Sequence, residues 1–228
     1  MKVVKLFPVV LLLLLGTNAI AQETPEFEIQ GGYSLAHFNP ARNYVRTPHD
    51  LNGGGFGFVY NVTHWMGFKA ELEKYGGTAW NIDFPEPIVT PYHIINTSSL
   101  ATIPAGTYKA SGGLATYLFG PQFKYYGHKV QPFAQTLFGG ARSNLWSNLL
   151  TAGGISGVST KNISGFSMTV GGGVDYNANR YISIRLGEFD YLMTRLNPPL
   201  LTAYGGIQNQ NSFRFSCGVV FQLGSFKR

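Results

Sequence analysis

The chain has 228 residues, of which only 12% are charged and 14% are aromatic, with 29 glycines and a formal net charge of +6. Soluble domains average about 25% charged residues, and the basic residues here are too scattered for a nucleic-acid surface, so neither class fits. A single cysteine, Cys217, excludes an intramolecular disulfide and a cysteine-based zinc site. The composition instead fits a chain that presents an apolar exterior to lipid.

The N-terminus has the pattern of an export signal. Two early lysines precede an apolar run over Leu6–Leu15, and Ala19-Ile20-Ala21 matches a small-x-small cleavage site. The run is too short to cross a bilayer as a helix, and no later window approaches the roughly 20 apolar residues that a membrane helix needs. We therefore expect residues 1–21 to be a signal peptide, residues 22–228 to form the mature domain, and any membrane insertion to be made by strands.

Eight segments of the mature chain alternate between apolar and polar residues with the period of two that is typical of strands. Short connections alternate with long ones, as in outer-membrane barrels, whose turns lie in the periplasm and whose long loops lie outside. The sequence therefore predicts an all-β fold, an eight-stranded antiparallel transmembrane β-barrel. The predicted strands are Glu26–Phe38, Leu51–Val62, Met66–Trp80, Thr107–Tyr126, Val130–Asn144, Asn162–Tyr176, Tyr181–Leu196 and Ser212–Gly224.

The last predicted strand shows the alternation most clearly. Its odd positions from Phe213 to Leu223 are apolar, and its even positions are mostly polar or glycine, with Val220 as the exception. In the third segment, by contrast, the polar face carries Lys69 and two glutamates, which are too many charges for a soluble core. The apolar faces are therefore expected in lipid and the polar faces in the lumen. Cys217 lies on an apolar face, which favours a small hydrophobe over a reactive thiol.

The polar faces predict a network of charges in the lumen. Because an unpaired buried charge is costly, we expect the opposite signs to pair. A salt-bridged plug is favoured in so narrow a barrel, and a selectivity ring in a pore is the alternative. The expected members are Lys69, Glu71, Glu73, Arg142, Asp175, Arg185, Glu188, Asp190 and Arg214.

Two segments do not settle on one face. In the fifth, Gln135 interrupts the face that Phe133 and Leu137 suggest.

In the seventh, an outward face through Ile184 and Leu186 would also send Glu188 and Asp190 into lipid. A β-bulge near Gly187 would return both carboxylates to the lumen. Alternatively, that end of the strand rises out of the hydrocarbon layer.

The long connections are the expected site of any interaction, because loops on a rigid scaffold often carry recognition, although they could also simply cap the barrel. They cover Asn39–Asp50, Asn81–Gly106, Leu145–Lys161 and Asn197–Asn211. Four basic residues near the outer rim could meet lipopolysaccharide phosphates or could simply be solvated: Arg42, Arg46, Lys109 and Lys161.

Aromatic residues gather at the opposite, short-turn end, as a periplasmic girdle would. The expected girdle consists of Trp65, Tyr60, Tyr125, Tyr126, Tyr176 and Tyr181.

Further motifs lie along nearly the whole mature chain, at Phe27–Ser34, Leu118–Phe123, Pro132–Ala134, Leu137–Arg142, Gly171–Asp175, Ile182–Arg185, Asp190–Leu192 and Phe213–Ser216. In these motifs the chain resembles the small outer-membrane β-barrel domain family, which includes the transmembrane domain of outer-membrane protein A, and within it barrels of the acidobacterial type. The resemblance implies the fold and the location, and it brings no catalytic motif. Chains of this class often end on an aromatic residue that the insertion machinery reads, whereas this one continues past Phe221 to Arg228.

Catalysis is not expected. Some eight-stranded barrels modify lipid A with a histidine and a serine or acidic partner, but here His37 and Ser34 fall on opposite faces of the first strand. No metal-binding histidine motif and no nucleophile elbow is present, and the recurrent glycine pairs match no nucleotide loop. We expect such glycines at close backbone approaches.

The expected role is therefore structural or interaction-based, such as membrane stabilisation or adhesion through the long loops. A narrow pore for small solutes and a lipid A-modifying enzyme are the alternatives. We expect a monomer in the outer membrane without cofactor or metal, with membrane lipid, lipopolysaccharide and the insertion machinery as partners.

Overall fold

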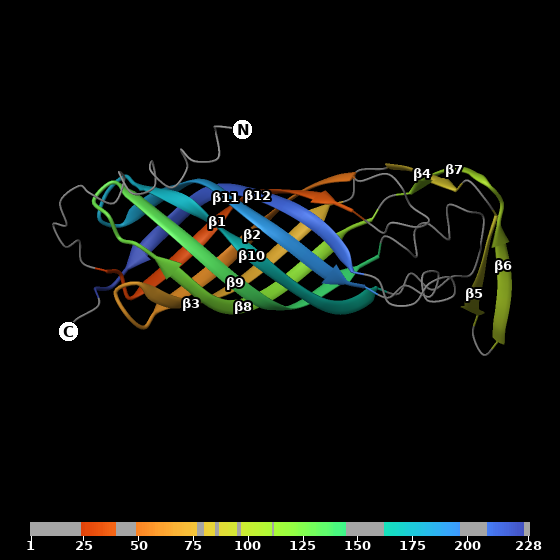
Figure 1. The fold of residues 1–228 in the computed structure, drawn as a ribbon, viewed down its shortest axis with the longest axis horizontal. Helices are drawn as coiled ribbons and strands as arrows, with labels where there is room; N and C mark the ends of the chain where they lie inside the picture. Colours follow the sequence, from red (N-terminus) through yellow and green to blue (C-terminus); the bar gives the residue numbers. More distant parts are fainter. Residues whose placement is uncertain are drawn as a thin grey trace, which may run out of the picture.

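The computed structural model describes residues 24–39, 49–76, 80–84, 87–94, 97–110, 112–144, 162–196 and 209–225. Eight long strands form the body of the molecule: β1 (Phe27–Phe38), β2 (His49–Asn61), β3 (Met66–Gly76), β8 (Leu114–Lys124), β9 (Val130–Ser143), β10 (Ile163–Asn177), β11 (Ile182–Arg195) and β12 (Gln210–Leu223). They close into an antiparallel barrel in the order β1-β12-β11-β10-β9-β8-β3-β2 (Figure 1). The predicted eight-stranded barrel is confirmed. The predicted signal peptide, residues 1–21, lies outside the described residues.

Closure depends on the first and last strands. Strand β1 pairs with β12 from Phe27 opposite Leu223 to His37 opposite Phe213, and its other edge pairs with β2. The barrel therefore has no open edge, as a membrane requires of strands that cross it. Within the described residues, no helix is long and apolar enough to span a membrane.

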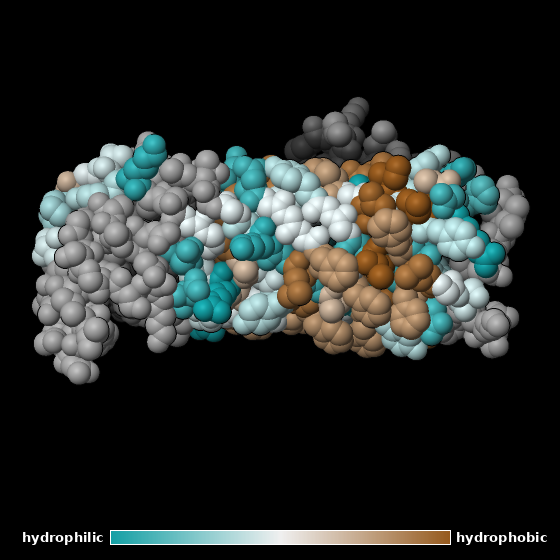
Figure 2. Space-filling model, turned by 180° about the vertical axis from the view of Figure 1, so that it is seen from behind, coloured by the Kyte–Doolittle hydropathy of each residue, from teal (hydrophilic) through white to brown (hydrophobic). Residues whose placement is uncertain are grey.

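The period of two places apolar side chains outside and polar ones inside, as the sequence predicts. On β12, Phe213 and Phe221 are exposed, whereas Arg214 and Gln222 are buried in the lumen. The apolar residues form a band across the barrel wall, with polar residues on both sides of it (Figure 2). Cys217 lies on this outer face, half-buried between its neighbours. Such a band is the surface that a barrel presents to the hydrocarbon layer.

The predicted bulge near Gly187 is present in β11. Val174 pairs with Gly187 but Asp175 pairs with Arg185, and on the other edge of β11 the register shifts between Arg185 and Glu188. One extra residue in β11 therefore lets Arg185 and Glu188 both face the lumen.

The ambiguity in β9 is resolved in favour of the lumen. Phe133, Gln135 and Leu137 are all buried inside, and Phe138 is exposed outside. Arg142 shares the parity of Phe138 and is exposed on the outer face, so its expected place in the lumen is wrong. The glycine pair between Phe138 and Arg142 hides the alternation at this end of the strand.

The connection between β3 and β8 differs from the expected loop. It contains β4 (Trp80–Phe84), β5 (Ile88–Ile94), β6 (Thr97–Ile103) and β7 (Gly106–Ala110). Strand β4 pairs with β7, and β5 pairs with β6, so the connection is an arm of two-stranded sheets rather than a loop. Residues rich in isoleucine, valine and threonine favour this ladder. The predicted barrel strands Met66–Trp80 and Thr107–Tyr126 are therefore too long at the arm end, because residues 80 and 107–110 belong to the arm.

The arm stands beyond the end of the barrel that lies opposite the short turns (Figure 1). Lys109 is exposed on β7. The other long connections, with Arg42, Arg46 and Lys161, fall at residues 40–48, 145–161 and 197–208, outside the described residues.

Candidate functional site

Charged side chains from six of the eight barrel strands converge in the lumen, where each is at most 9% exposed. Strand alternation brings them there, since each lies on the face opposite the lipid-facing residues. The cations are Lys69, Lys124, Arg185 and Arg214, and the carboxylates are Glu28, Glu71, Glu73, Asp175, Glu188 and Asp190.

Arg214 is the centre of the upper group, on the side of the long connections. Its guanidinium donates to Asp190 Oδ2 from Nε at 2.9 Å and to Glu188 Oε1 from Nη2 at 3.1 Å. It also donates to Glu71 on β3, across the lumen from β12. One arginine thus joins three strands, and a planar guanidinium suits such multiple carboxylate contacts.

Lys69 extends this group towards β9. Its ammonium lies 2.6 Å from Glu71 Oε2 and 3.5 Å from Glu188 Oε1, and it donates to Gln135 Oε1 at 3.0 Å. The Gln135 amide in turn donates to Glu188 Oε1 at 2.7 Å. Gln135 therefore connects a cation to a carboxylate as a neutral member of the network.

A lower group lies nearer the short turns. Lys124 donates to Glu28 Oε1 at 2.9 Å and to Asp175 Oδ2 at 2.8 Å. Arg185 donates from Nε to Asp175 Oδ1 at 2.8 Å and from Nη1 to Glu188 Oε2 at 2.5 Å. Arg185 therefore connects the lower and upper groups into one network.

The aromatic rings of Phe133 and Tyr126 close the lower group. The Arg185 guanidinium carbon lies 4.2 Å from the centre of the Phe133 ring, a cation–π contact. Tyr126 donates to Glu28 Oε1 at 3.0 Å and accepts from Asn61 Nδ2 at 2.7 Å. Burial, together with the Glu28 carboxylate, raises the pKa of the Tyr126 hydroxyl above its usual range, so it stays a hydrogen-bond donor.

This position of Tyr126 corrects the expected girdle, since its ring turns into the mouth of the barrel. The remaining girdle residues are exposed at the short-turn end, as expected: Trp65, Tyr60, Tyr125, Tyr176 and Tyr181.

Glycines on β2 make room for the network. A Cβ added to Gly55 would lie 2.6 Å from the Glu73 carboxyl carbon, and one added to Gly57 would lie 2.7 Å from Gln30 Cγ. Close approach of side chains therefore requires glycine at these positions. The recurrent glycines of the sequence thus have a packing role here.

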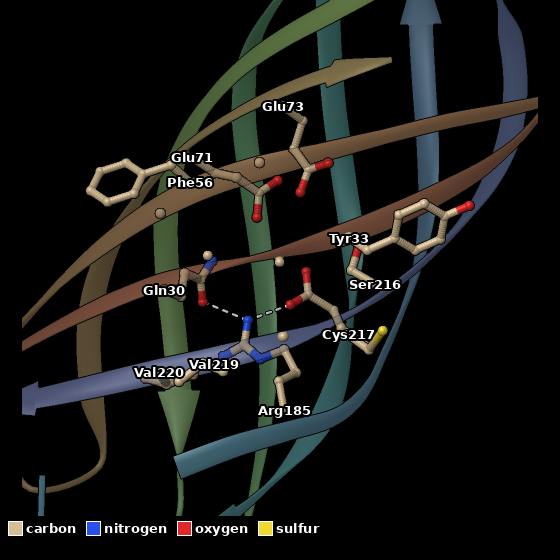
Figure 3. Close-up of a pocket in the computed structure, with 16 residues that line it drawn as sticks. Gln30, Tyr33, Phe56, Glu71, Glu73, Arg185, Ser216, Cys217, Val219 and Val220 are labelled. Atoms are coloured by element: carbon tan, nitrogen blue, oxygen red, sulfur yellow. Dashed lines mark hydrogen bonds and ion pairs between the residues drawn. The ribbon is translucent and has the colours of Figure 1, made fainter. Parts of the chain in front are cut away.

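A small cavity of about 30 Å³ lies beside Glu71, Glu73, Arg185 and Ser216, enough for one or two waters (Figure 3). Glu73 Oε2, buried in this region, has no hydrogen-bond partner among the described residues.

An apolar layer lies above the network, at the end of the long connections. Its members come from the upper ends of their strands and are fully or almost fully buried: Ala36, Phe38, Leu51, Leu114, Ala141, Leu192 and Leu196. Sequence alternation did not predict this layer, because apolar residues on both faces of a strand obscure which face is inside. Above the ion pairs, the lumen is thus filled by these apolar side chains together with buried neutral polar ones such as Ser143, Thr194 and Ser212.

The structure brings together every expected network residue except Arg142. Sequence reasoning missed Glu28, Lys124, Gln135 and Tyr126 as members. The signal for Glu28 and Lys124 was available, because both alternate with lipid-facing aromatics.

Few features of the described residues suggest catalysis. Ser34 faces the lumen and shares hydrogen bonds with Ser216 at 2.9 Å and Tyr75 at 3.1 Å, whereas His37 is outside and lies 2.7 Å from Asp50. Within the described part of the chain, no group of three His, Cys, Asp or Glu side chains is arranged to hold a metal ion.

No protein-family model and no curated protein matches the sequence. Among solved structures, neisserial surface protein A matches with a TM-score of 0.53 at 12% identity, covering 87% of this chain and 97% of that one. Two others have lower TM-scores. OprG from Pseudomonas aeruginosa has 0.46 at 13% identity over 90% and 98% of the two chains, and the attachment invasion locus protein of Yersinia pestis has 0.42 at 11% over 87% and 99%.

At such identities the likeness concerns the fold alone, and of these three matches neisserial surface protein A, with a TM-score above 0.5, supports it. The closed barrel of eight antiparallel strands is consistent with that match. The chain therefore has the fold of the small eight-stranded outer-membrane β-barrels.

Proposed function

We propose that the protein is a non-conducting barrel of the outer membrane with a structural or surface-interaction role. In this role the barrel is a rigid body that holds the β4–β7 and β5–β6 arm away from the membrane. The observation that carries the proposal is the buried ion-pair network, which joins strands on different sides of the lumen.

The network supports a closed rather than an open lumen. A conducting pore needs charged side chains that face water and exchange partners with passing ions. Here Lys69 and Arg214 are 0% and 1% exposed, and each is held by more than one carboxylate. The apolar layer above them would further oppose the passage of hydrated solutes.

The arm supports a role in surface contact. Strands β4 and β7 form a sheet of only two strands, and so do β5 and β6. Among the described residues, neither sheet pairs with a third strand along its outer edges. A free edge is a common place for another chain to add a strand.

The positions of Ser34 and His37 favour this role over lipid modification. The two side chains lie on opposite faces of β1, so they cannot act as a nucleophile and its base.

Planar-bilayer recordings test the closed lumen. We expect no large, stable openings from the purified barrel, with an established porin recorded in the same membrane as the positive control. Stable openings at the level of ordinary porins would refute the proposed plug. Heat-modifiable gel mobility of the outer-membrane fraction tests the location, and recovery of the protein in the soluble periplasm would refute it.

Replacement of residues 80–110 by a short Asn-Gly turn tests the arm. The shortened protein should keep its heat-modifiable mobility, because the arm contributes no strand to the barrel. Cells that express it should lose adherence to surfaces that the complete protein binds. Equal adherence of the two strains would contradict the proposed role of the arm.

A further inference from the structure

Cations lie on the outer face of the barrel just above the apolar band. Lys74, Arg142 and Arg195 are exposed within the last three residues of β3, β9 and β11, at the end of the long connections. Among the described residues, no carboxylate forms a salt bridge with any of them. Asp50, at the same end, is already paired with His37 at 2.7 Å. This rim therefore offers positive charge that the described protein leaves uncompensated.

Two of these cations share one row across the wall. Lys74 is the register partner of Ala115, Ala115 of Arg142, and Arg142 of Ser164. Because neighbouring strands lie about 4.8 Å apart, the backbones of Lys74 and Arg142 are about 10 Å apart. Both are long side chains, and the small Ala115 between them leaves space above it, so both can reach a single group placed there.

The groups around this space are hydrogen-bond donors. With its amide oxygen towards the guanidinium, Asn162 accepts from Arg142 Nε at 3.1 Å and Nη2 at 2.9 Å, which fixes one edge and leaves Nη1 for a ligand. The Tyr117 ring lies across Gly140, with its Cε2 atom 2.6 Å from where a Cβ would stand, so its hydroxyl lies over Gly140, one outward step below Arg142. Such a set suits an anion with several oxygens.

The row lies at the height of lipid headgroups. Leu72 is the next outward-facing residue below Lys74 on β3. It is 61% exposed and marks the top of the apolar band on that strand. Two residues of a strand span about 7 Å, which is similar to the thickness of the polar layer on one side of a bilayer.

We propose that Lys74 and Arg142 bind a phosphate group of a glycolipid in the outer leaflet. The identity of the lipid rests on the outer-membrane location proposed above, whereas the phosphate chemistry rests on the row itself. The Lys74 ammonium supplies a point charge and the free edge of Arg142 supplies directed donors, a combination that recognises phosphates.

Arg195 is a matched control on the same face. Arg195 belongs to a different row, in which it is the register partner of Phe166 on β10, and Phe166 is the register partner of Gly140 on β9. The exposed ring of Phe166 therefore lies between Arg195 and the strand that carries Arg142. A change of Arg195→Gln therefore removes one positive charge from the same rim without touching the proposed site.

The test titrates the folded protein in micelles with diphosphorylated lipid A and measures lipid adducts by native mass spectrometry. We expect the Lys74→Gln/Arg142→Gln variant to bind at least tenfold more weakly than the natural protein and Arg195→Gln to stay within twofold. Heat-modifiable mobility establishes that each variant is folded. Equal binding by the double variant and the natural protein would overturn the site.

Two further arms identify the ligand. In the first arm, lipid A without its phosphates is added to the natural protein, and its binding should be as weak as that of complete lipid A to the double variant. In the second arm, inorganic phosphate is added at the same concentration as the lipid, and it should not displace lipid A from the natural protein. Full binding of the dephosphorylated lipid would overturn the phosphate assignment, and displacement by inorganic phosphate would overturn the lipid assignment. Because binding in micelles is independent of conductance, adherence and location, this proposal and the proposed function fail separately.

Discussion

Arg214 and Asp190 are direct cross-strand partners on β12 and β11, and the guanidinium donates twice to one carboxylate oxygen, from Nε at 2.9 Å and Nη2 at 2.5 Å. The same arginine also contacts Glu188 and, across the lumen, Glu71. The pair therefore fixes the register of two neighbouring strands and ties them to the other side of the barrel. The pair contributes strongly to stability because Arg214 also contacts Glu188 and Glu71. Loss of its cation would leave several buried carboxylates close together.

Replacement Arg214→Met should destabilise the barrel by about 3–5 kcal/mol, because removal of one partner leaves buried charges uncompensated. Urea unfolding in lipid vesicles, followed by tryptophan fluorescence, measures the change. Arg195→Met is the control, since that side chain is exposed at the rim and its loss should cost no more than about 0.5 kcal/mol. An equal effect of the two substitutions would contradict a stabilising network.

Gly31 and Gly32 are neighbours with opposite tolerance for a methyl group. A Cβ on Gly32 would lie 2.8 Å from Gly218 Cα on β12, whereas one on Gly31 would approach nothing closer than Gly55 O at 3.8 Å. We expect Gly32→Ala to cost about 1–3 kcal/mol through forced separation of β1 and β12. Gly31→Ala should stay within about 0.5 kcal/mol of the natural protein in the same urea experiment. Similar urea midpoints for the two variants would show that β1 and β12 can separate at Gly32 without cost, and would contradict their close packing there.

The lumen and lipid faces of most strands were predictable from the sequence, because a period of two is a local property. Strand β3 is an example, where Lys69 and Glu71 alternate with Phe68 and Leu72. The bulge was predictable for a related reason. Without it, Glu188 would have to face hydrocarbon, and that cost is larger than the cost of one irregular residue pair.

The pairing of the charges was not predictable, because partners across a lumen depend on how eight strands close. Lys124 meets Glu28 across 96 positions of sequence, and nothing local to either residue indicates the other. The inner face of β9 was not predictable for a different reason, since Phe133 and Leu137 are apolar residues of the interior. An apolar residue inside a membrane barrel carries the same local signal as one outside.

Deletion of Gly187 should leave the barrel folded. Removal of one residue between Arg185 and Glu188 would give a regular ladder in which both keep their present partners on β12, Gly218 and Ser216. Heat-modifiable mobility should therefore persist, with a modest fall in the urea midpoint from the lost local twist.

Deletion of Val170 is the matched control for Gly187. Strand β10 is regular at Val170, so the deletion would move either Asp175 or Thr169 to the opposite face. We expect this variant to lose its folded, fast-migrating band. Loss of that band with the Gly187 deletion as well would contradict the bulge as the one extra residue of β11.

Cys217 provides a test of the two faces without any other substitution, because it is the single cysteine of the chain. It lies on the outer face, between lumen-facing Ser216 and Gly218. A nitroxide attached to Cys217 in lipid vesicles should relax strongly with molecular oxygen and weakly with a charged nickel chelate, since hydrocarbon dissolves the first and excludes the second. In the Ser216→Cys/Cys217→Ser variant the label enters the filled lumen and should be shielded from both reagents. Strong relaxation of the Cys217 label by the nickel chelate would place this face of β12 in water and contradict the lipid-facing assignment.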